Sequence, residues 1–345
     1  MEIWGFSHVY EQHHDESPGL NENNTCNSET EELVVYLSVT RSLLIYVPPF
    51  FIAIGTISSI LSILVLLRRT MRHNPAMFYL TVLSFFDIAV LNIGLLRHWI
   101  HVTFEVNIRA FSEFSCRFHA FLTYFTLDYS AWILVALTIN TCINVCMPLK
   151  GKIYCTLNRS KLSVVVITII LVFINGHLFF TVGIINNSCD ELDSFVSYYW
   201  PYIDFVVFCF LPFIIMAVCN ILIIRALTKA LNKFQPDSKN NSSLEIASRR
   251  QNQKYNVIAM SLSLNALFFL CTFPISLYFI FEPFYHDQYP NLMGLLETIS
   301  TLLMYFRNAI HFPAYCISGT KFRNEFIKMF EIKIKKPTDQ SVFYS

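Results

Sequence analysis

Apolar segments long enough to cross a lipid bilayer alternate with polar loops along the chain. A membrane-spanning helix needs about 20 mainly apolar residues, and seven segments meet that length. They occupy residues 43–67, 77–96, 118–145, 162–185, 198–224, 257–281 and 292–317. The pattern predicts an all-α membrane protein, folded as a bundle of seven transmembrane helices.

A shorter amphipathic pattern follows the seventh segment. Ser318 and Gly319 interrupt the apolar run, and residues 321–330 then resume with helical spacing. Four apolar side chains share one face of that helix, opposite its lysines and arginine: Phe322, Phe326, Ile327 and Phe330. A basic amphipathic helix of this kind lies in the membrane interface, in contact with lipid.

Three regions are predicted from these patterns. Residues 1–40 form a flexible extracellular tail, because they hold eight acidic side chains and no lysine or arginine. They also lack the basic start and apolar core of a signal peptide. Residues 41–330 form the seven-helix domain with its interfacial helix, and residues 331–345 form a cytoplasmic tail.

Composition and charge support a membrane protein with a defined orientation. The chain is 54% hydrophobic and 14% charged, whereas about a quarter of the residues in a soluble domain are charged. Basic residues gather in the loops after the first, third and fifth segments and in the C-terminal tail. Positive charge marks the cytoplasmic side, so we expect a plasma-membrane protein with its N-terminus outside. Glycosylation sequences at Asn23 and Asn186 fall on the predicted outer side.

Short motifs in a fixed order carry a family resemblance. They are residues 83–87 of the second segment, Cys116 at the start of the third, Pro212 in the fifth, residues 271–274 of the sixth, and Tyr315. In this order the chain resembles the rhodopsin-like (class A) G-protein-coupled receptors. Its second and third segments are similar to invertebrate FMRFamide-type neuropeptide receptors.

The resemblance implies a function and a set of partners. A receptor of this family binds an extracellular ligand, here most simply a neuropeptide, and acts through a heterotrimeric G protein and arrestin. The resemblance also implies a disulfide between Cys116 and Cys189, and extracellular thiols do oxidise. Two free cysteines are the alternative. Nothing in the sequence indicates an enzyme, a cofactor, a metal site or a nucleic-acid partner.

Several activation motifs of the family are altered. Asn140, Thr141 and Cys142 stand where the family carries an acid, an arginine and an aromatic residue. Thr272 replaces a tryptophan two residues before Pro274, and Asn220 replaces a tyrosine. We therefore expect weak or unusual G-protein coupling.

Two opposite charges lie inside predicted spans, Asp87 and Arg307. Each is ten residues from the cytoplasmic end of its segment, or roughly 15 Å deep at 1.5 Å per residue. We expect an Asp87–Arg307 ion pair that replaces the sodium ion bound there in the family, with Ser130 and His311 lining the same cavity. Arg307 bound to another acceptor, or extended to water, is the alternative. His311 is expected to be a neutral hydrogen-bonding residue rather than a switch.

Candidate ligand contacts are Thr123, Asp128 and Glu297. Thr123 occupies the place where amine receptors carry an aspartate, which argues against a small amine. Asp128 either faces a cationic ligand group or bonds to a neighbouring helix. Acidic residues at the predicted outer mouth would attract a cationic ligand, or are simply solvated.

Other functions remain as alternatives. A retinal-based light sensor needs a lysine in the last span, and residues 292–317 contain none. A transporter would favour repeated halves and broken helices, and neither is evident in the sequence. A receptor-like protein that binds ligand with little or no G-protein coupling, and a chemosensory receptor, both stay open.

Overall fold

The computed structural model describes residues 26–185, 188–232, 241–285 and 288–334. The predicted glycosylation sites Asn23 and Asn186 lie outside these ranges, as do residues 1–25 of the expected tail and residues 335–345.

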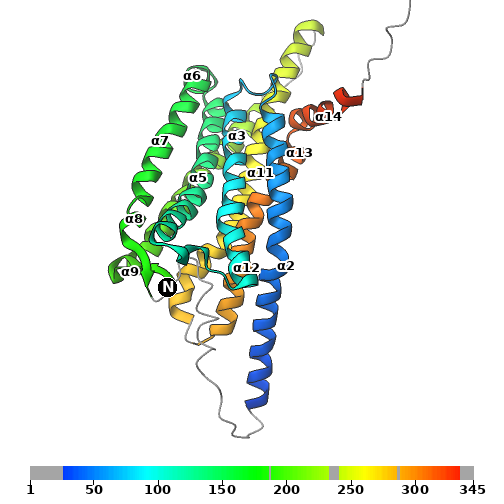
Figure 1. Cartoon of the computed structure of the whole chain (residues 1–345). Helices are drawn as coiled ribbons and strands as arrows, with labels where there is room; N and C mark the ends of the chain where they lie inside the picture. Colours follow the sequence, from blue (N-terminus) through cyan, green and yellow to red (C-terminus); the bar gives the residue numbers. More distant parts are fainter. Residues whose placement is uncertain (1–25, 186–187, 233–240, 286–287, 335–345) are drawn as a thin grey trace, which may run out of the picture.

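Long helices running between the two ends of the molecule form the bundle (Figure 1). The first three are α2 (Cys26–Leu66), α3 (Pro75–Ala89) continued through η1 (Val90–Leu95) and α4 (Leu96–Phe104), and α5 (Glu113–Cys146). The next three are α7 (Leu157–Asn175) with α8 (Leu178–Thr181), α9 (Ser194–Asp204) continued through η3 (Phe205–Phe210) and α10 (Leu211–Asn232), and α11 (Asn241–Tyr285). Within the described residues, these six are long and apolar enough to cross a membrane.

The seventh helix is made of two pieces, α12 (Pro290–Ala309) and α13 (His311–Ser318). α12 packs against α2 and α11, and α13 packs against α11, so the pair completes the bundle. The break follows from Pro313, which has no N–H to donate to the carbonyl of Ala309 four residues earlier. That carbonyl instead accepts a hydrogen bond from Ser58 Oγ at 3.4 Å. The predicted seven-helix fold is confirmed.

The first helix begins earlier than predicted. Residues 26–40 are helical, so a flexible tail over 1–40 is wrong for this part. Extending a helix adds a hydrogen bond for each residue fixed, without the cost of nucleation. The polar residues before the apolar span can therefore continue its helix.

The fourth helix ends earlier than predicted. α7 stops at Asn175, and the chain then forms a two-stranded antiparallel hairpin, β1 (Val182–Ile185) and β2 (Ser188–Glu191). The β-branched residues of β1 favour a strand, although their hydropathy suited a transmembrane segment. A disulfide joins Cys189 of β2 to Cys116 of α5, which fixes the hairpin to the third helix.

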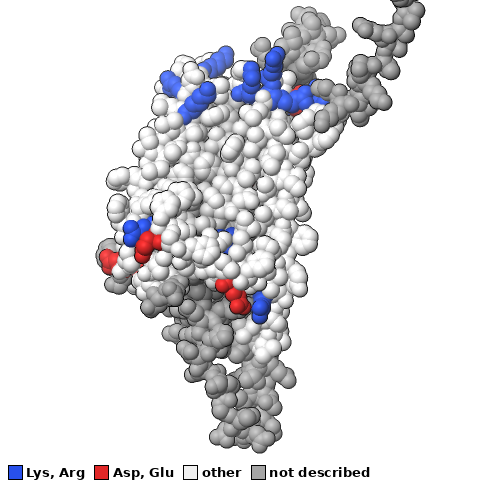
Figure 2. All heavy atoms as spheres, in the orientation of Figure 1, with Lys and Arg blue, Asp and Glu red and all other residues white. Residues whose placement is uncertain are grey.

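Charge separates the two ends of the molecule (Figure 2). Basic side chains gather at the end that carries the short helix α6 (Pro148–Tyr154) and the terminal helix α14 (Thr320–Ile334). We call this the basic end; its residues include Arg68, Arg69, Arg72, Lys150, Lys152, Arg159, Lys161, Lys321, Arg323 and Lys328. The opposite end, with the hairpin and the short helix η2 (Ile108–Phe111), is called the hairpin end.

α14 is the amphipathic helix expected after the seventh span. Phe322 is fully buried and packs edge-on against Phe312 of α13, with ring centroids 5.8 Å apart. Arg68 of the first loop forms an ion pair with Glu325 at 3.1 Å. These contacts dock α14 against the basic end of the bundle.

Candidate functional site

Polar side chains from five helices meet in the middle of the bundle: Asp87 of α3, Ser130 of α5, Thr272 of α11, Arg307 and Asn308 of α12, and His311 of α13. Each is at most 2% exposed. We call these six residues the core cluster. A buried charge is costly unless it has a partner, so the pairing within this cluster determines its stability.

Asp87 pairs with His311, not with Arg307. The Nδ1 atom of His311 lies 2.7 Å from Asp87 Oδ2. The predicted Asp87–Arg307 ion pair is absent from the described structure and is therefore corrected. α12 runs towards the basic end, so His311 lies about 6 Å further along the seventh helix than Arg307. That position brings the imidazole level with the carboxylate.

Arg307 binds neutral groups on the neighbouring helices. Its guanidinium donates to Thr272 Oγ1 at 3.3 Å and to Ser130 Oγ and Asn308 Oδ1 at 3.4 Å. Its Cζ atom also lies 5.1 Å from the centroid of the Phe268 ring, within the range of a cation–π contact. Arg307 thus takes the second of the predicted arrangements, binding to another acceptor.

The altered inner triplet lies at the basic end of α5. Asn140, Thr141 and Cys142 are 6%, 2% and 8% exposed. The hydroxyl of Thr141 donates back to the carbonyl of Leu137 at 2.8 Å, and Cys142 packs against Ile223 and Ile258. This part of α5 therefore presents no cationic side chain from the triplet.

A chain of hydrogen bonds near the triplet joins three helices. Thr138 Oγ1 of α5 donates to Asn265 Oδ1 of α11 at 3.0 Å, and Asn265 Nδ2 donates to Asn220 Oδ1 of α10 at 2.8 Å. We call this set the amide link. Sequence reasoning identified Asn220 only as a replaced tyrosine and missed Asn265 and Thr138. The available signal was a single asparagine within the apolar sixth segment.

Three other residues that carry the family resemblance lie within helices of the bundle. Tyr315 is fully buried, with its ring centroid 5.5 Å from that of Phe322. Pro212 and Pro274 lie within α10 and α11. The structure places all three in the helices expected for them.

Thr123 and Glu297 lie in the half of the bundle nearer the hairpin. Thr123 Oγ1 accepts a hydrogen bond from Arg109 Nη2 at 3.3 Å and donates to the carbonyl of His119. Glu297 Oε2 accepts from the Tyr278 hydroxyl at 3.3 Å. Both predicted contacts are nearly buried, at 2% and 6% exposure.

Asp128 bonds to the fourth helix. Its Oδ2 accepts from Asn175 Nδ2 at 2.9 Å, and the carboxylate is 1% exposed. This contact matches the second reading of Asp128, a bond to a neighbouring helix. Within the described ranges, no group of three or more histidine, cysteine, aspartate or glutamate side chains is placed to hold a metal ion.

Comparison with known proteins assigns the family. The model of the family described as "7 transmembrane receptor (rhodopsin family)" matches residues 58–311. The chain belongs to this family. The resemblance found in the motifs is thus confirmed, and the protein is a multi-pass membrane receptor.

Relatives of this receptor are known from vertebrates and invertebrates. The mouse thyrotropin-releasing hormone receptor is 26% identical over 321 residues, covering 85% of this chain and 79% of the relative. The Drosophila melanogaster FMRFamide receptor is 23% identical over 58% of this chain and 37% of the relative. The Caenorhabditis elegans neuromedin U receptor homologue is 30% identical over 32% of this chain and 28% of the relative.

Proposed function

We propose that this receptor binds an extracellular neuropeptide at its hairpin end and signals at its basic end. One observation carries the proposal: the similarity to thyrotropin-releasing hormone receptors covers 85% of the chain, so it includes both ends of the bundle. The FMRFamide and neuromedin U relatives are also named for neuropeptides.

Charge supports the orientation within this proposal. Basic side chains favour the cytoplasmic side of a membrane, and they gather at one end here (Figure 2). The basic end then faces the cytoplasm of the plasma membrane, and the N-terminus lies outside. This places the disulfide-anchored hairpin on the oxidising side, where a disulfide persists.

Thr123 and Glu297 are the proposed ligand contacts. They lie on α5 and α12, in the half of the bundle covered by the anchored hairpin. Thr123 is accompanied by the buried Arg109, which argues further against a small cationic amine. Asp128 belongs to the packing of α5 against α7 and is left out of the ligand site.

Coupling to a heterotrimeric G protein is proposed to be weak. An arginine in the inner triplet would offer charge-assisted hydrogen bonds to a partner, whereas Thr141 is buried and bonded to its own helix. The same observation favours a second candidate function, a receptor that captures a peptide with little or no G-protein signalling.

A peptide screen tests the proposal. Cells displaying the receptor are exposed to a neuropeptide library, and binding, G-protein dissociation and arrestin recruitment are measured together. We expect at least one peptide to bind saturably, and Thr123→Val or Glu297→Gln to weaken its binding at equal surface expression. Binding with neither signalling readout would select the second candidate. Normal surface expression with no peptide bound would refute both.

A further inference from the structure

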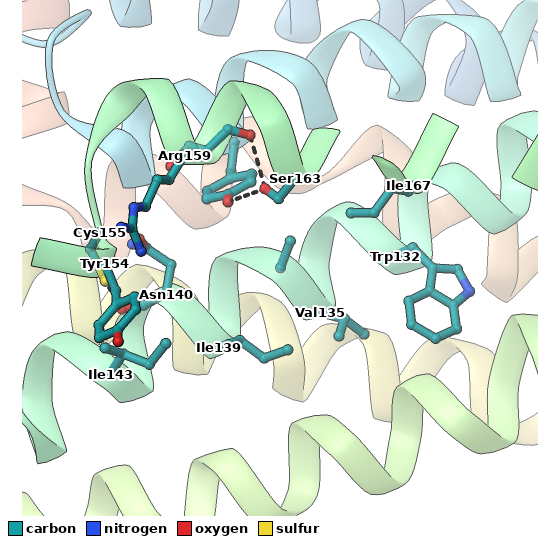
Figure 3. A pocket seen from close by; sticks show the side chains of 13 residues that line it. Trp132, Val135, Ile139, Asn140, Ile143, Tyr154, Cys155, Arg159, Ser163 and Ile167 are labelled. Carbon is teal, nitrogen blue, oxygen red and sulfur yellow. Dashed lines mark hydrogen bonds between the residues drawn. The ribbon is translucent and has the colours of Figure 1, made fainter. Parts of the chain in front are cut away.

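A pocket opens on the side of the bundle near the basic end (Figure 3). It has a volume of about 400 Å³ and lies between α3, α5 and α7, with α6 closing one end. That volume falls within the roughly 300–1,000 Å³ of typical ligand pockets. The pocket is separate from the core cluster and from Thr123 and Glu297.

The pocket has an apolar half and a polar half. Figure 3 shows Trp132, Val135 and Ile167 at one end, and Asn140, Tyr154 and Arg159 at the other. The guanidinium of Arg159 lies over the Tyr154 ring, 4.8 Å from its centroid. This cation–π contact positions a positive charge at the polar end of an apolar trough.

Asn140 supplies a second observation at the polar end. It lines the pocket at 6% exposure, and its backbone carbonyl already accepts a hydrogen bond from Asn144 Nδ2 at 2.9 Å. A side-chain amide at the wall of a pocket can both donate to and accept from a bound molecule. The neighbouring hydroxyls already have partners, because Tyr79 and Ser163 lie 2.6 Å apart and Ser163 donates to the carbonyl of Ser160.

The surroundings of the pocket are apolar, as lipid-facing surfaces are. On α7, Val165, Ile169 and Phe173 are 52%, 63% and 87% exposed. A molecule entering sideways would therefore come from the membrane rather than from water. Positive charge at the polar end comes from Arg159, with Lys152 and Lys161 close to it in the chain.

We propose that this pocket binds one anionic glycerophospholipid from the membrane leaflet at the basic end. An acyl chain lies in the apolar half, the phosphate pairs with Arg159, and the headgroup region hydrogen-bonds to the Asn140 amide. The choice of an anionic lipid rests on the proposed orientation, because the cytoplasmic leaflet carries the anionic lipids. Such a lipid would lie against Asn140, the first residue of the altered inner triplet.

Lipid binding to the purified full chain tests the charged half of the site. Native mass spectrometry would compare dioleoyl-phosphatidylserine with dioleoyl-phosphatidylcholine at equal concentrations. We expect tighter binding of the serine lipid, and a loss of about fivefold in Arg159→Gln, the contribution of one cationic side chain near an anionic surface. Lys161→Gln is the matched control: it removes the same charge two residues away, from a side chain outside the pocket.

Filling the trough tests the apolar half. Ala136 lines the pocket, so Ala136→Phe should abolish the high-affinity binding of both lipids. Val165→Phe adds the same ring to an exposed position of α7 outside the pocket and should leave binding unchanged. Thermal unfolding confirms that each variant is folded.

Three results would overturn the proposal: equal losses in Arg159→Gln and Lys161→Gln, retained serine-lipid preference in Ala136→Phe, or a sterol that binds the pocket in place of both phospholipids. The assay uses neither peptide nor G protein. A negative result here therefore leaves the proposed receptor function standing, and an inactive receptor leaves the lipid site testable.

Discussion

At the scale of single residues, the core cluster distributes two buried charges among separate partners. Asp87 has the imidazole of His311 at 2.7 Å, while Arg307 has hydroxyls, an amide and an aromatic ring. The two residues expected to pair with each other are thus held by different neighbours. The consequence is that Asp87 has a hydrogen-bonding partner within the bundle.

Sodium should therefore have no measurable effect on the stability of this receptor. The purified chain would be unfolded by heat in sodium chloride and in the chloride of a bulky organic cation at equal ionic strength. We expect equal melting temperatures, because Asp87 Oδ2 already has His311 Nδ1 as a partner 2.7 Å away. A rise of several degrees in sodium would mean that Asp87 still binds the ion.

The pairing itself is tested by comparing two double variants. His311→Phe should cost about 1–3 kcal/mol, the range for leaving a buried hydrogen-bonding group without its partner. Adding Asp87→Asn should recover part of this loss, since contacting residues are energetically coupled. When Asp87→Asn is instead combined with Arg307→Gln, it should recover less of the stability that Arg307→Gln alone loses. Thermal unfolding measures the stability of all these variants. A stronger coupling of Asp87 to Arg307 than to His311 would mean that Asp87 pairs with Arg307 after all.

The sequence predicted which residues form the core cluster better than how they pair. Asp87, Arg307, Ser130 and His311 were identified because polar residues inside a span are costly and rare. Their pairing depends on the break in the seventh helix before His311 and on the positions of five packed helices. Neither can be read from the spacing of residues in one chain.

At the scale of elements, the amide link connects α5, α10 and α11 close to the altered triplet. Asn265 is fully buried and bonds to both neighbouring helices. The link is a polar restraint between the third, fifth and sixth helices. It joins the helices that carry Thr141 and Asn220, two positions where the sequence differs from the motifs expected for the family.

Removing the link should loosen this end of the bundle. Asn265→Leu leaves Thr138 and Asn220 without this partner, and hydrogen bonds between membrane helices contribute about 0.6 kcal/mol each on average. We expect a lower melting temperature and raised basal signalling at equal surface expression. Ser261→Ala is the control on the same helix, since its buried hydroxyl has no hydrogen-bond partner within the described residues. Equal effects in both variants would contradict a specific role for the link.

The hairpin should depend on its disulfide. The bond links two cysteines 73 residues apart. Closing a loop of that length stabilises a folded chain by about 4 kcal/mol, and the gain is smaller where a membrane already restrains the chain. Cys116→Ser and Cys189→Ser should each reduce surface expression and peptide binding. Peptide mapping of the native protein provides the direct check, and a reduced, unmodified Cys189 would contradict the bond.

The element boundaries show what hydropathy alone determines. It identified every membrane helix, because burial in lipid requires long apolar helices. It placed the end of the fourth helix too late, since Val182–Ile185 is as apolar as a span but forms a strand. It also missed residues 26–40 of α2, where a polar segment continues an existing helix.

At the scale of the whole molecule, this receptor combines the seven-helix fold of its family with an inner triplet that carries no cation. The seven-helix bundle is that of its family, and the anchored hairpin and α14 complete the structure, whereas the triplet at the basic end offers no cation. If the proposed orientation holds, a G protein would approach this face. The absence of a positive charge in the triplet should then weaken G-protein coupling more than it weakens folding or peptide binding.

Restoring the charge should therefore increase coupling. The triple change Asn140→Asp, Thr141→Arg and Cys142→Tyr rebuilds the family motif, and Thr141→Arg alone tests the charge without enlarging the buried Cys142 site. Nucleotide exchange on purified G proteins, with the receptor reconstituted in lipid, would be measured with and without the peptide found by the screen.

We expect peptide-driven exchange to rise at least several-fold in both variants, because an arginine offers charge-assisted hydrogen bonds that Thr141 lacks. Thr141→Gln is the matched control, since it adds a long side chain without charge and should leave exchange unchanged. Strong exchange by the natural chain, unaltered by Thr141→Arg, would contradict the expectation. Another contact at the basic end would then have to replace the arginine, and the lysines of α6 and α14 are cations at that end to test.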